Sequence, residues 1–396
     1  MMRTVDALII GGGPAGLAAG IVLGRAGFTV LLCERQTFPI DKVCGEGLMP
    51  TGVQHLEQLN IRVRERFPFA GIRYVAPAGG VATAAFREGV GWGIRRTALS
   101  GALFSAAQEV ASLCVMQHVA AVPQSCGEQG VEVRVGDQLV RARLVIGADG
   151  LRSQVRRWAG LDNPGRRHWR WGARQHFRVR PWSNYVEVHW SEHGVEAYVT
   201  PVAEEQVGIA FLWHRGRYAD LHGGDDLIPS LAAAFPALQS RLRGAGAVNE
   251  GRAVGPLQRR AKAVVSDGVL LLGDAAGYLD AITGEGLSVA LAQALALKET
   301  VVPGLQNSFG LIPWQALARY QAAYARIVHS SAQLTELALL LSRFPALCNW
   351  VTRALGRDPV LFQQLLSANM GLQSPYRFPT ALRLVVGLGT TVKEFP

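Results

Sequence analysis

Three glycines near the N-terminus have the spacing that brings a backbone close to a phosphate group, Gly11-x-Gly13-x-x-Gly16. In such a turn the first glycine permits the tight bend, the second lets the backbone approach a pyrophosphate, and the third lets a helix pack closely on a strand. Pro14 and Ala15 stand where that helix begins, and its free N–H groups attract negative charge. The pattern predicts a dinucleotide site.

A carboxylate follows where a ribose is expected. Glu34 ends the second predicted strand, where it can accept hydrogen bonds from a ribose diol, and Arg35 comes directly after it. A glycine-rich turn in an α/β domain without a nucleotide is the alternative. Strand, turn, helix, strand and terminal acid in this order favour nucleotide binding, with Glu34 and Arg35 as candidate contacts.

Two later motifs indicate which nucleotide is bound. The segment 147–156 contains Asp149, and the segment 273–277 begins with Gly273 and Asp274. They resemble the DG and GD motifs of the flavoprotein monooxygenases and their relatives, in which the GD aspartate holds the ribityl chain of FAD. Each aspartate alone could simply form a turn or cap a helix. Together and in this order they predict FAD, with Asp274 at the ribityl chain.

A further glycine-rich turn precedes a helix that is predicted over 286–300. Gly284 and Gly286 flank Glu285, and Leu287 follows in the first turn of the helix, so that its free N–H groups would face the flavin. Reduction places negative charge on the flavin ring, which a helix N-terminus stabilises. Arg96 matches the superfamily's arginine beside the FAD pyrophosphate; an exposed arginine at a helix start is the alternative.

The branch of the superfamily is indicated by three segments that resemble the geranylgeranyl reductase family of FAD enzymes: 42–50, 273–277 and 282–286. The resemblance extends to about residue 300. It implies an FAD-dependent oxidoreductase that reduces a C=C bond in an apolar small molecule, with NAD(P)H or a reduced electron carrier as reductant. Tyr198 and Pro201 match an aromatic residue and a proline over the substrate cavity. Ala281 replaces a proline of many relatives and a usual tryptophan is absent, so the substrate is either isoprenoid or polyketide-like.

Three residues are candidate catalytic groups. Cys44 lies in the glycine-rich segment 42–50, where a thiol over the flavin could donate or relay a proton during double-bond reduction. A loop cysteine that only packs is the alternative. Glu46 and Glu285 are alternative acids, although glutamates in loops are most often solvated.

Two other functions share the same FAD residues. A flavin-dependent monooxygenase would hydroxylate or epoxidise an apolar or aromatic substrate, but aromatic hydroxylases tend to have histidine where this chain has Gly277. Halogenases need a positioned lysine and a tryptophan element, and residues 71–93 contain no lysine. A non-catalytic flavoprotein that carries electrons is the third alternative.

The elements that must position these residues form an α/β fold. Apolar strands are predicted over 5–10 and 28–32 around a helix over 15–26, which gives a βαβ unit. A hairpin over 131–135 and 139–146 leads into Asp149, and a buried strand over 268–272 leads into Asp274. The sequence therefore predicts a Rossmann-like FAD-binding domain.

A second domain is predicted where the apolar pattern changes to period two, between about Trp169 and Leu212, as expected for an inserted antiparallel sheet. The predicted FAD-binding domain is discontinuous, and residues about 71–93 contribute to the substrate domain. A helical C-terminal region follows, with breaks at Pro345 and Gly356. The three parts are 1–165 with 255–300, 166–254, and 301–396.

The charge is strongly positive. The net charge is +10, carried by 36 Arg and 4 Lys, with nine of the arginines between Arg152 and Arg180. One interpretation is solvated arginines from a GC-rich genome; the other is a basic face for an anionic membrane surface or an acidic electron carrier. That face is predicted to contain six arginines: Arg156, Arg157, Arg166, Arg167, Arg170 and Arg174. Nucleic acid is not expected, because no recognised nucleic-acid module accompanies the charge.

The cysteines and histidines give no metal pattern. Five cysteines without a C-x-x-C pair favour a reduced, cytoplasmic compartment, with peripheral contact to a membrane left open. Metal-ligand spacing is absent at His55, His176, His189 and His214, which are interpreted as ordinary surface or core residues. The apolar run Ala7–Ile10 leads into glycines, and no later run has 18 apolar residues without a charge, so neither a signal peptide nor a membrane span is expected.

Overall fold

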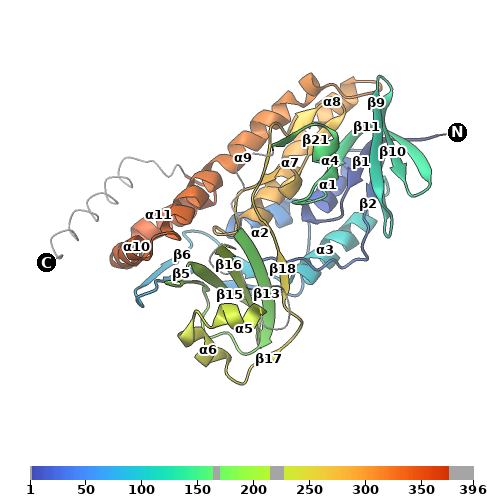
Figure 1. Cartoon of the computed structure of the whole chain (residues 1–396). Coiled ribbons are helices and arrows are strands. Elements are labelled where there is room, and N and C mark those ends of the chain that lie inside the picture. Colours follow the sequence, from blue (N-terminus) through green and yellow to red (C-terminus); the bar gives the residue numbers. More distant parts are fainter. Residues whose placement is uncertain (1, 164–169, 215–226, 374–396) are drawn as a thin grey trace.

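The computed structural model describes residues 2–163, 170–214 and 227–373. Its first sheet is parallel at its centre, in the order β21-β11-β1-β2-β8, with β20 antiparallel at one edge and the hairpin β9–β10 joined to β11 (Figure 1). Its strands are β1 (Arg3–Ile10), β2 (Val30–Cys33), β8 (Leu113–Met116), β9 (Ala121–Gly127), β10 (Gly130–Val135), β11 (Gln138–Gly147), β20 (Val265–Ser266) and β21 (Val269–Leu271).

The βαβ prediction is confirmed with small shifts at the element ends. β1 is fully buried at Ala7, Leu8 and Ile9, because helices cover the sheet. Gly27 follows the first helix at φ +90°, a conformation that glycine adopts without strain, and lets the chain turn into β2. The helices of this part are α1 (Pro14–Arg25), α2 (Pro50–Gln58), α3 (Arg96–Gln108), α4 (Gln154–Trp158), α7 (Gly286–Thr300) and α8 (Val302–Asn307).

The second sheet has the strand order β17-β13-β16-β15-β14-β5-β6, with β18 also paired to β13. Its pairs are antiparallel except for β14 and β5, which run parallel. Its strands are β5 (Gly71–Val75), β6 (Val81–Ala85), β13 (Arg170–Arg178), β14 (Val186–Trp190), β15 (Val195–Ala203), β16 (Gln206–His214), β17 (Gly246–Ala247) and β18 (Arg252–Val254).

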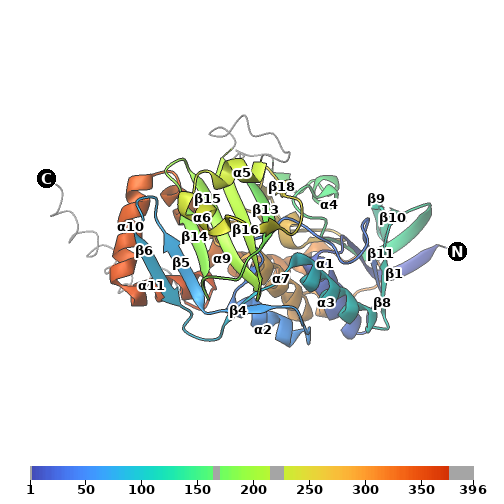
Figure 2. The ribbon, with the colours of Figure 1, turned by 90° about the horizontal axis from the view of Figure 1, so that it is seen from below.

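Helices cover both faces of this sheet (Figures 1 and 2). Apolar residues of α5 (Leu227–Ala232) and α6 (Pro236–Leu242) pack on one face with Ile209 and Phe211. On the other face, Val186 and Val188 share a core with α10 (Pro345–Arg357) and α11 (Pro359–Asn369). The long helix α9 (Trp314–Leu341) leads from α7 to these two helices.

Two smaller sheets have three strands each. One has the order β3-β7-β4 and the other the order β12-β19-β22. Their strands are β3 (Gly47–Leu48), β4 (Phe67–Phe69), β7 (Gly91–Gly93), β12 (Asp162–Asn163), β19 (Arg259–Ala261) and β22 (Gly277–Tyr278), and η2 (Gly273–Ala275) is a short 3-10 helix. Within the described residues, no helix is both long enough and apolar enough to cross a membrane.

The prediction of a single basic face is wrong for three of its arginines. Arg156, Arg170 and Arg174 are only 2%, 5% and 1% exposed. Each forms an ion pair, with partners that include Asp162, Glu196 or Asp41, because a buried guanidinium is stable only beside a carboxylate. Arg157 is exposed, and the predicted members Arg166 and Arg167 lie outside the described residues.

Candidate active site

A cavity of about 550 Å³ lies between the two large sheets and is bordered by α9, α10 and α11. One end is lined by the turn at Gly13, by Asp274 and by the start of α7. The other end is lined by apolar side chains of the second sheet and the C-terminal helices, which include Ile72, Phe86, Val186, Val188, Leu212 and Phe362. One continuous space can therefore hold a polar cofactor at one end and an apolar substrate at the other.

The glycine-rich turn leaves no room for side chains at two positions. Gly11 has φ +110°, and a Cβ there would lie 2.4 Å from the carbonyl oxygen of Ala148. A Cβ on Gly16 would lie 1.9 Å from the carbonyl oxygen of Gly11. At Gly13, in contrast, a Cβ would meet nothing within 4 Å, and this residue lines the cavity together with Pro14 and Ala15. The N-terminus of α1 is thus open toward the cavity.

Glu34 and Arg35 differ in their surroundings. The carboxylate of Glu34 is 8% exposed and accepts hydrogen bonds from the backbone N–H groups of Gly12 (2.7 Å) and Gln36 (2.9 Å). These contacts fix the carboxylate beside the turn. Arg35 is exposed, and neither Glu34 nor Arg35 lines the cavity, so the cofactor contacts of both residues stay predictions.

Asp149 contacts the start of a helix and Asp274 borders the cavity. Asp149 accepts a hydrogen bond from the N–H of Gln154 at 2.6 Å, at the start of α4, whose N-cap residue is Ser153. Its Oδ1 is buried without a hydrogen-bond partner among the described residues. Burial raises the pKa of Asp274, while the positive charges of Lys42 and Arg96 act in the opposite direction.

Arg156 connects the two aspartate motifs. Its Nη1 donates to the carbonyl oxygen of Ala275 at 2.8 Å, and its Nη2 donates to that of Leu151 at 3.0 Å. Nε donates to Asp162 at 2.7 Å. An arginine inside the first motif therefore holds the second motif in place, which explains why this charge is buried.

The residues at this end of the cavity fit FAD. Gly13 offers open backbone, Asp274 borders the space, and Arg96 is 6% exposed with Nη1 buried and without a hydrogen-bond partner among the described residues. Such a donor is stable when an anion such as a pyrophosphate accepts its hydrogen bond. Gly284, Gly286 and Leu287 line the same space at the N-terminus of α7.

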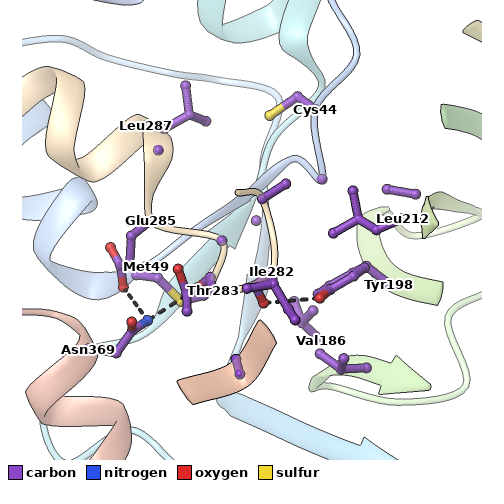
Figure 3. Close-up of a pocket in the computed structure, with 18 of the residues that line it drawn as sticks. Cys44, Met49, Val186, Tyr198, Leu212, Ile282, Thr283, Glu285, Leu287 and Asn369 are labelled. Atoms are coloured by element: carbon purple, nitrogen blue, oxygen red, sulfur yellow. Dashed lines mark hydrogen bonds between the residues drawn. The ribbon is translucent and has the colours of Figure 1, made fainter. Parts of the chain in front are cut away.

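Glu285 is buried in the cavity wall and differs from a solvated loop glutamate. It is 4% exposed, and burial raises its pKa to about 8. Asn369 Nδ2 donates to Glu285 Oε1 and to the carbonyl oxygen of Thr283, both at 3.2 Å (Figure 3). At neutral pH this carboxyl group is mostly protonated, so it can donate a proton inside an apolar space.

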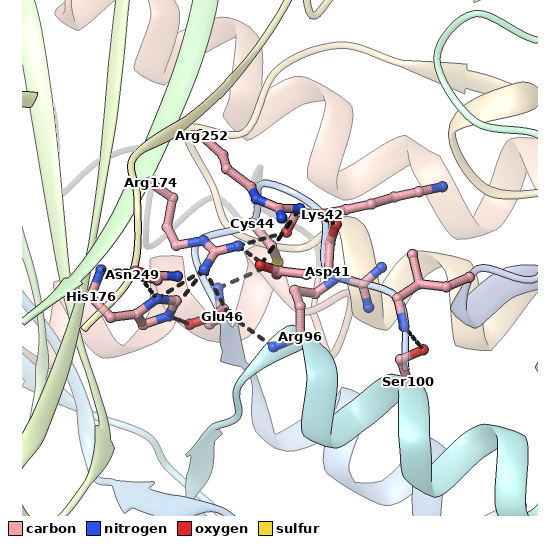
Figure 4. A network of polar contacts seen from close by, with 11 residues as sticks. Asp41, Lys42, Cys44, Glu46, Arg96, Ser100, Arg174, His176, Asn249 and Arg252 are labelled. Carbon is pink, nitrogen blue, oxygen red and sulfur yellow. Dashed lines mark hydrogen bonds and ion pairs between the residues drawn. The ribbon is translucent and has the colours of Figure 1, made fainter. Parts of the chain in front are cut away.

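Glu46 is also buried, at 1% exposed, but it faces a polar network (Figure 4). Its Oε1 accepts from the backbone N–H of Arg96 at 2.8 Å, and its Oε2 lies 2.5 Å from His176 Nε2. Arg174 Nη1 contacts His176 Nδ1 at 2.9 Å, and Arg174 Nη2 donates to Asp41 at 2.6 Å. Glu46 itself has φ +60°, a strained conformation for glutamate that the network holds in place.

Cys44 lies between this network and the cavity. It lines the cavity, and its Sγ accepts a hydrogen bond from the N–H of Glu46 at 3.4 Å. Burial raises the pKa of its thiol, so that the group stays protonated and gives up its proton less readily than Glu285. The acidity of the two groups therefore favours Glu285 as the proton donor.

The sequence motifs did not indicate the hydrogen-bond partners of Glu46 and Glu285. His176 lies 130 positions from Glu46, and Asn369 lies in the predicted helical tail, where no motif marks it. A third buried cluster joins Arg170 to Glu196 (2.7 Å) and Asp280 (2.8 Å). In the described ranges, no group of three or more His, Cys, Asp or Glu residues is placed to hold a metal ion.

Tyr198 occupies the position that the family resemblance predicts, in the wall of the cavity. Its hydroxyl donates to the carbonyl oxygen of Ile282 at 3.0 Å (Figure 3). This bond ties β15 of the second sheet to the loop that leads into α7. The substrate end and the cofactor end of the cavity are thus linked by a hydrogen bond.

Comparison with known proteins adds a family match. The sequence pattern of the FAD binding domain family matches residues 4–306. Menaquinone reductase of Mycolicibacterium smegmatis is 28% identical over 375 residues, which cover 87% of each chain. Digeranylgeranylglycerophospholipid reductase 1 of Methanothermobacter thermautotrophicus is 27% identical over 309 residues, 72% of this chain and 74% of the relative.

Solved structures share the fold at lower identity. A flavoprotein/dehydrogenase from Cytophaga hutchinsonii has a TM-score of 0.83 at 20% identity and covers 98% of this chain and 100% of its own. The flavin-dependent brominase Bmp2 has a TM-score of 0.81 at 18% identity, with 99% and 100% covered. At these identities the similarity shows the fold alone.

Proposed function

The chain belongs to the FAD binding domain family, and on this premise we propose that it is an oxidoreductase that reduces a C=C bond in the isoprenoid chain of a neutral, apolar substrate. Membership of this family identifies the chain as an FAD-dependent oxidoreductase. The observation that carries the finer proposal is Glu285, a buried acid with a pKa of about 8 in the wall of an apolar cavity.

The cavity wall supports an uncharged substrate. Among the described residues that line it, the only Lys or Arg are Lys42 and Arg96, and both act on Asp274 at the cofactor end. A phosphate group at the apolar end would have no cation beside it among these residues. A phospholipid or diphosphate headgroup would therefore stay outside the cavity, while an uncharged isoprenoid chain can enter it.

The names of the relatives agree with this choice of substrate. One relative is named for menaquinone and another for digeranylgeranylglycerophospholipid. Both compounds carry isoprenoid chains with C=C bonds. An isoprenoid is therefore favoured over a polyketide-like molecule.

Reduction of a C=C bond requires one hydride and one proton. Bound FAD, once reduced by NAD(P)H or by a separate reduced electron carrier, supplies the hydride. Glu285 supplies the proton: its O–H bond breaks, a C–H bond forms at the second carbon, and the carboxylate regains a proton from solvent before the next turnover. Asn369 orients the acid through its hydrogen bond to Oε1.

The proposal is tested by anaerobic reoxidation. Protein with its FAD reduced is mixed, without oxygen, with menaquinone or with a geranylgeranyl lipid, and the return of the absorbance of oxidised FAD is followed. We expect reoxidation in a single turnover and a product that has gained hydrogen on carbon. If reoxidation needs oxygen and the product has gained an oxygen atom, the protein is a monooxygenase; if no compound is changed, it is an electron carrier.

A further inference from the structure

The outer surface of the C-terminal helices exposes large apolar side chains. Leu337 and Leu340 on α9 are 45% and 46% exposed, and Phe344, between α9 and α10, is 54% exposed. Leu337 and Leu340 are three positions apart, which places them on one side of the helix, and Phe344 follows four positions later. We call these three residues the apolar corner. Helix α10, which follows Phe344, lies at the end of the molecule opposite the N-terminus (Figures 1 and 2).

The apolar corner is continuous with the substrate cavity. Leu337 is exposed to solvent and also lines the cavity, together with Leu334, Ala338 and Leu341 from the same helix. The helix that forms this wall of the cavity thus presents apolar side chains to the inside and to the outside. An apolar molecule could pass here without leaving apolar surroundings.

The helices that carry the corner have more basic than acidic residues. Residues 314–373, which form α9 to α11, contain five arginines and only two acidic residues. Arg353 and Arg357 are exposed, four positions apart on α10. Large apolar side chains together with excess arginine are the combination by which a surface helix binds an anionic bilayer.

We propose that the apolar corner docks on an anionic lipid bilayer, with Leu340 and Phe344 inserted among the acyl chains. The docking follows from this surface alone. A second step rests on the proposed function: the docked protein takes its substrate directly from the bilayer, past Leu337. The proposed membrane contact thus lies at α9 and α10 and differs from the segment 152–180, whose arginines the sequence left open as solvated side chains or as a basic face for a membrane or an electron carrier.

The test is vesicle flotation of the FAD-containing full-length protein. Vesicles of phosphatidylcholine with phosphatidylglycerol are compared with vesicles of phosphatidylcholine alone. The test variant is Leu340→Glu with Phe344→Glu. The matched control is Phe309→Glu, which changes a fully exposed aromatic residue before α9. Leu337 is left intact because it lines the cavity.

We expect the natural chain and the control to float with the anionic vesicles and to float less with the neutral vesicles. The double variant should lose about tenfold or more of its binding, because two large apolar side chains no longer leave water. Retained FAD and an unchanged melting temperature show that the variant is folded.

Three results would overturn the proposal: no flotation of the natural chain, an equal loss for Phe309→Glu, or a dimer in solution that the double variant dissociates. The last result would assign the corner to a second copy of the chain. Flotation does not depend on turnover. If the protein floats but reduces no alkene in the separate anaerobic test, that result contradicts the proposed function and leaves the docking intact.

Discussion

Asn369 at the end of α11 donates a hydrogen bond to Glu285 at the start of α7, over 3.2 Å. The two residues are 84 positions apart, and their contact joins α11 to a buried carboxyl group in the cavity wall, whose pKa burial raises to about 8. The C-terminal helices therefore complete the site, in addition to covering the second sheet.

Glu285→Gln should keep FAD and lose the proton donor. The amide has nearly the same shape but no acidic proton, so reaction of the reduced protein with the alkene should slow about 100-fold or more. Reduction of FAD by its donor should change little. Rapid-mixing kinetics of each half-reaction, with Glu205→Gln in an exposed turn as control, measure both effects. A normal rate with the alkene would exclude Glu285 as the acid.

The same substitution should change how stability depends on pH. The pKa of Glu285 is raised from the ordinary 4.5 to about 8 in the folded chain. Between these values the folded state keeps a proton that the unfolded state has lost, so the free energy of unfolding falls as the pH rises. Glutamine does not titrate, so the free energy of unfolding of Glu285→Gln does not fall in this way. Its stability relative to the natural chain should increase from about pH 5 to about pH 8, by about 1.4 kcal/mol per unit of pKa shift. Urea unfolding across this range would contradict the assignment if the two curves stayed parallel.

Cys44→Ser should have a smaller effect than Glu285→Gln. The sequence suggested Cys44 as a proton donor, but burial raises the pKa of its thiol, which leaves Glu285 as the stronger acid. We expect a loss of less than about tenfold in the reaction with the alkene, below the range typical of general acid catalysis. A loss of 100-fold or more, with unchanged FAD reduction, would return the role to Cys44.

Asp274→Ala should purify with little FAD. The substitution removes the carboxylate that borders the cofactor end of the cavity and leaves Arg96 and Lys42 without the charge that faces them. Flavin absorbance per protein, with the exposed Asp137→Ala as control, measures the occupancy. Full occupancy in Asp274→Ala would show that this motif does not hold the cofactor.

Arg174→Met should be strongly destabilising. Arg174 is 1% exposed, and its removal leaves the Glu46–His176 pair without its cation and Asp41 with only the longer contact, 3.8 Å, to Arg252. Loss of one partner of a buried ion pair costs about 3–5 kcal/mol. Chemical unfolding should show this loss, whereas Arg157→Met at an exposed position should change stability by about 0.5 kcal/mol or less. Equal effects would contradict the buried network.

The local elements could be predicted because their signals are local. The helix predicted over 286–300 has these bounds in the structure, and the hairpin predicted over 131–135 and 139–146 forms as β10 and β11. Both depend on the period of apolar residues and on turn residues within a short window. Asp274 was likewise marked by its own motif.

The contacts between distant segments could not be predicted. The arginines 156, 170 and 174 are close in sequence, but each points to a different carboxylate, so their spacing gave no information about burial. The pKa of Glu285 depends on how α9 and α11 enclose it, which no motif records. A single sequence carries no signal for pairs such as Glu46 and His176.

The central claim is that hydrogen is added to carbon in an isoprenoid chain, and a single turnover in D₂O tests it most directly. Protein with reduced FAD is mixed anaerobically with menaquinone, the product is returned to H₂O, and its fragments are examined by mass spectrometry. We predict deuterium that stays on the isoprenoid chain, with no oxygen gained. Deuterium that washes out completely would mean that only the quinone oxygens were reduced, and this result, or a gain of oxygen, would contradict the account.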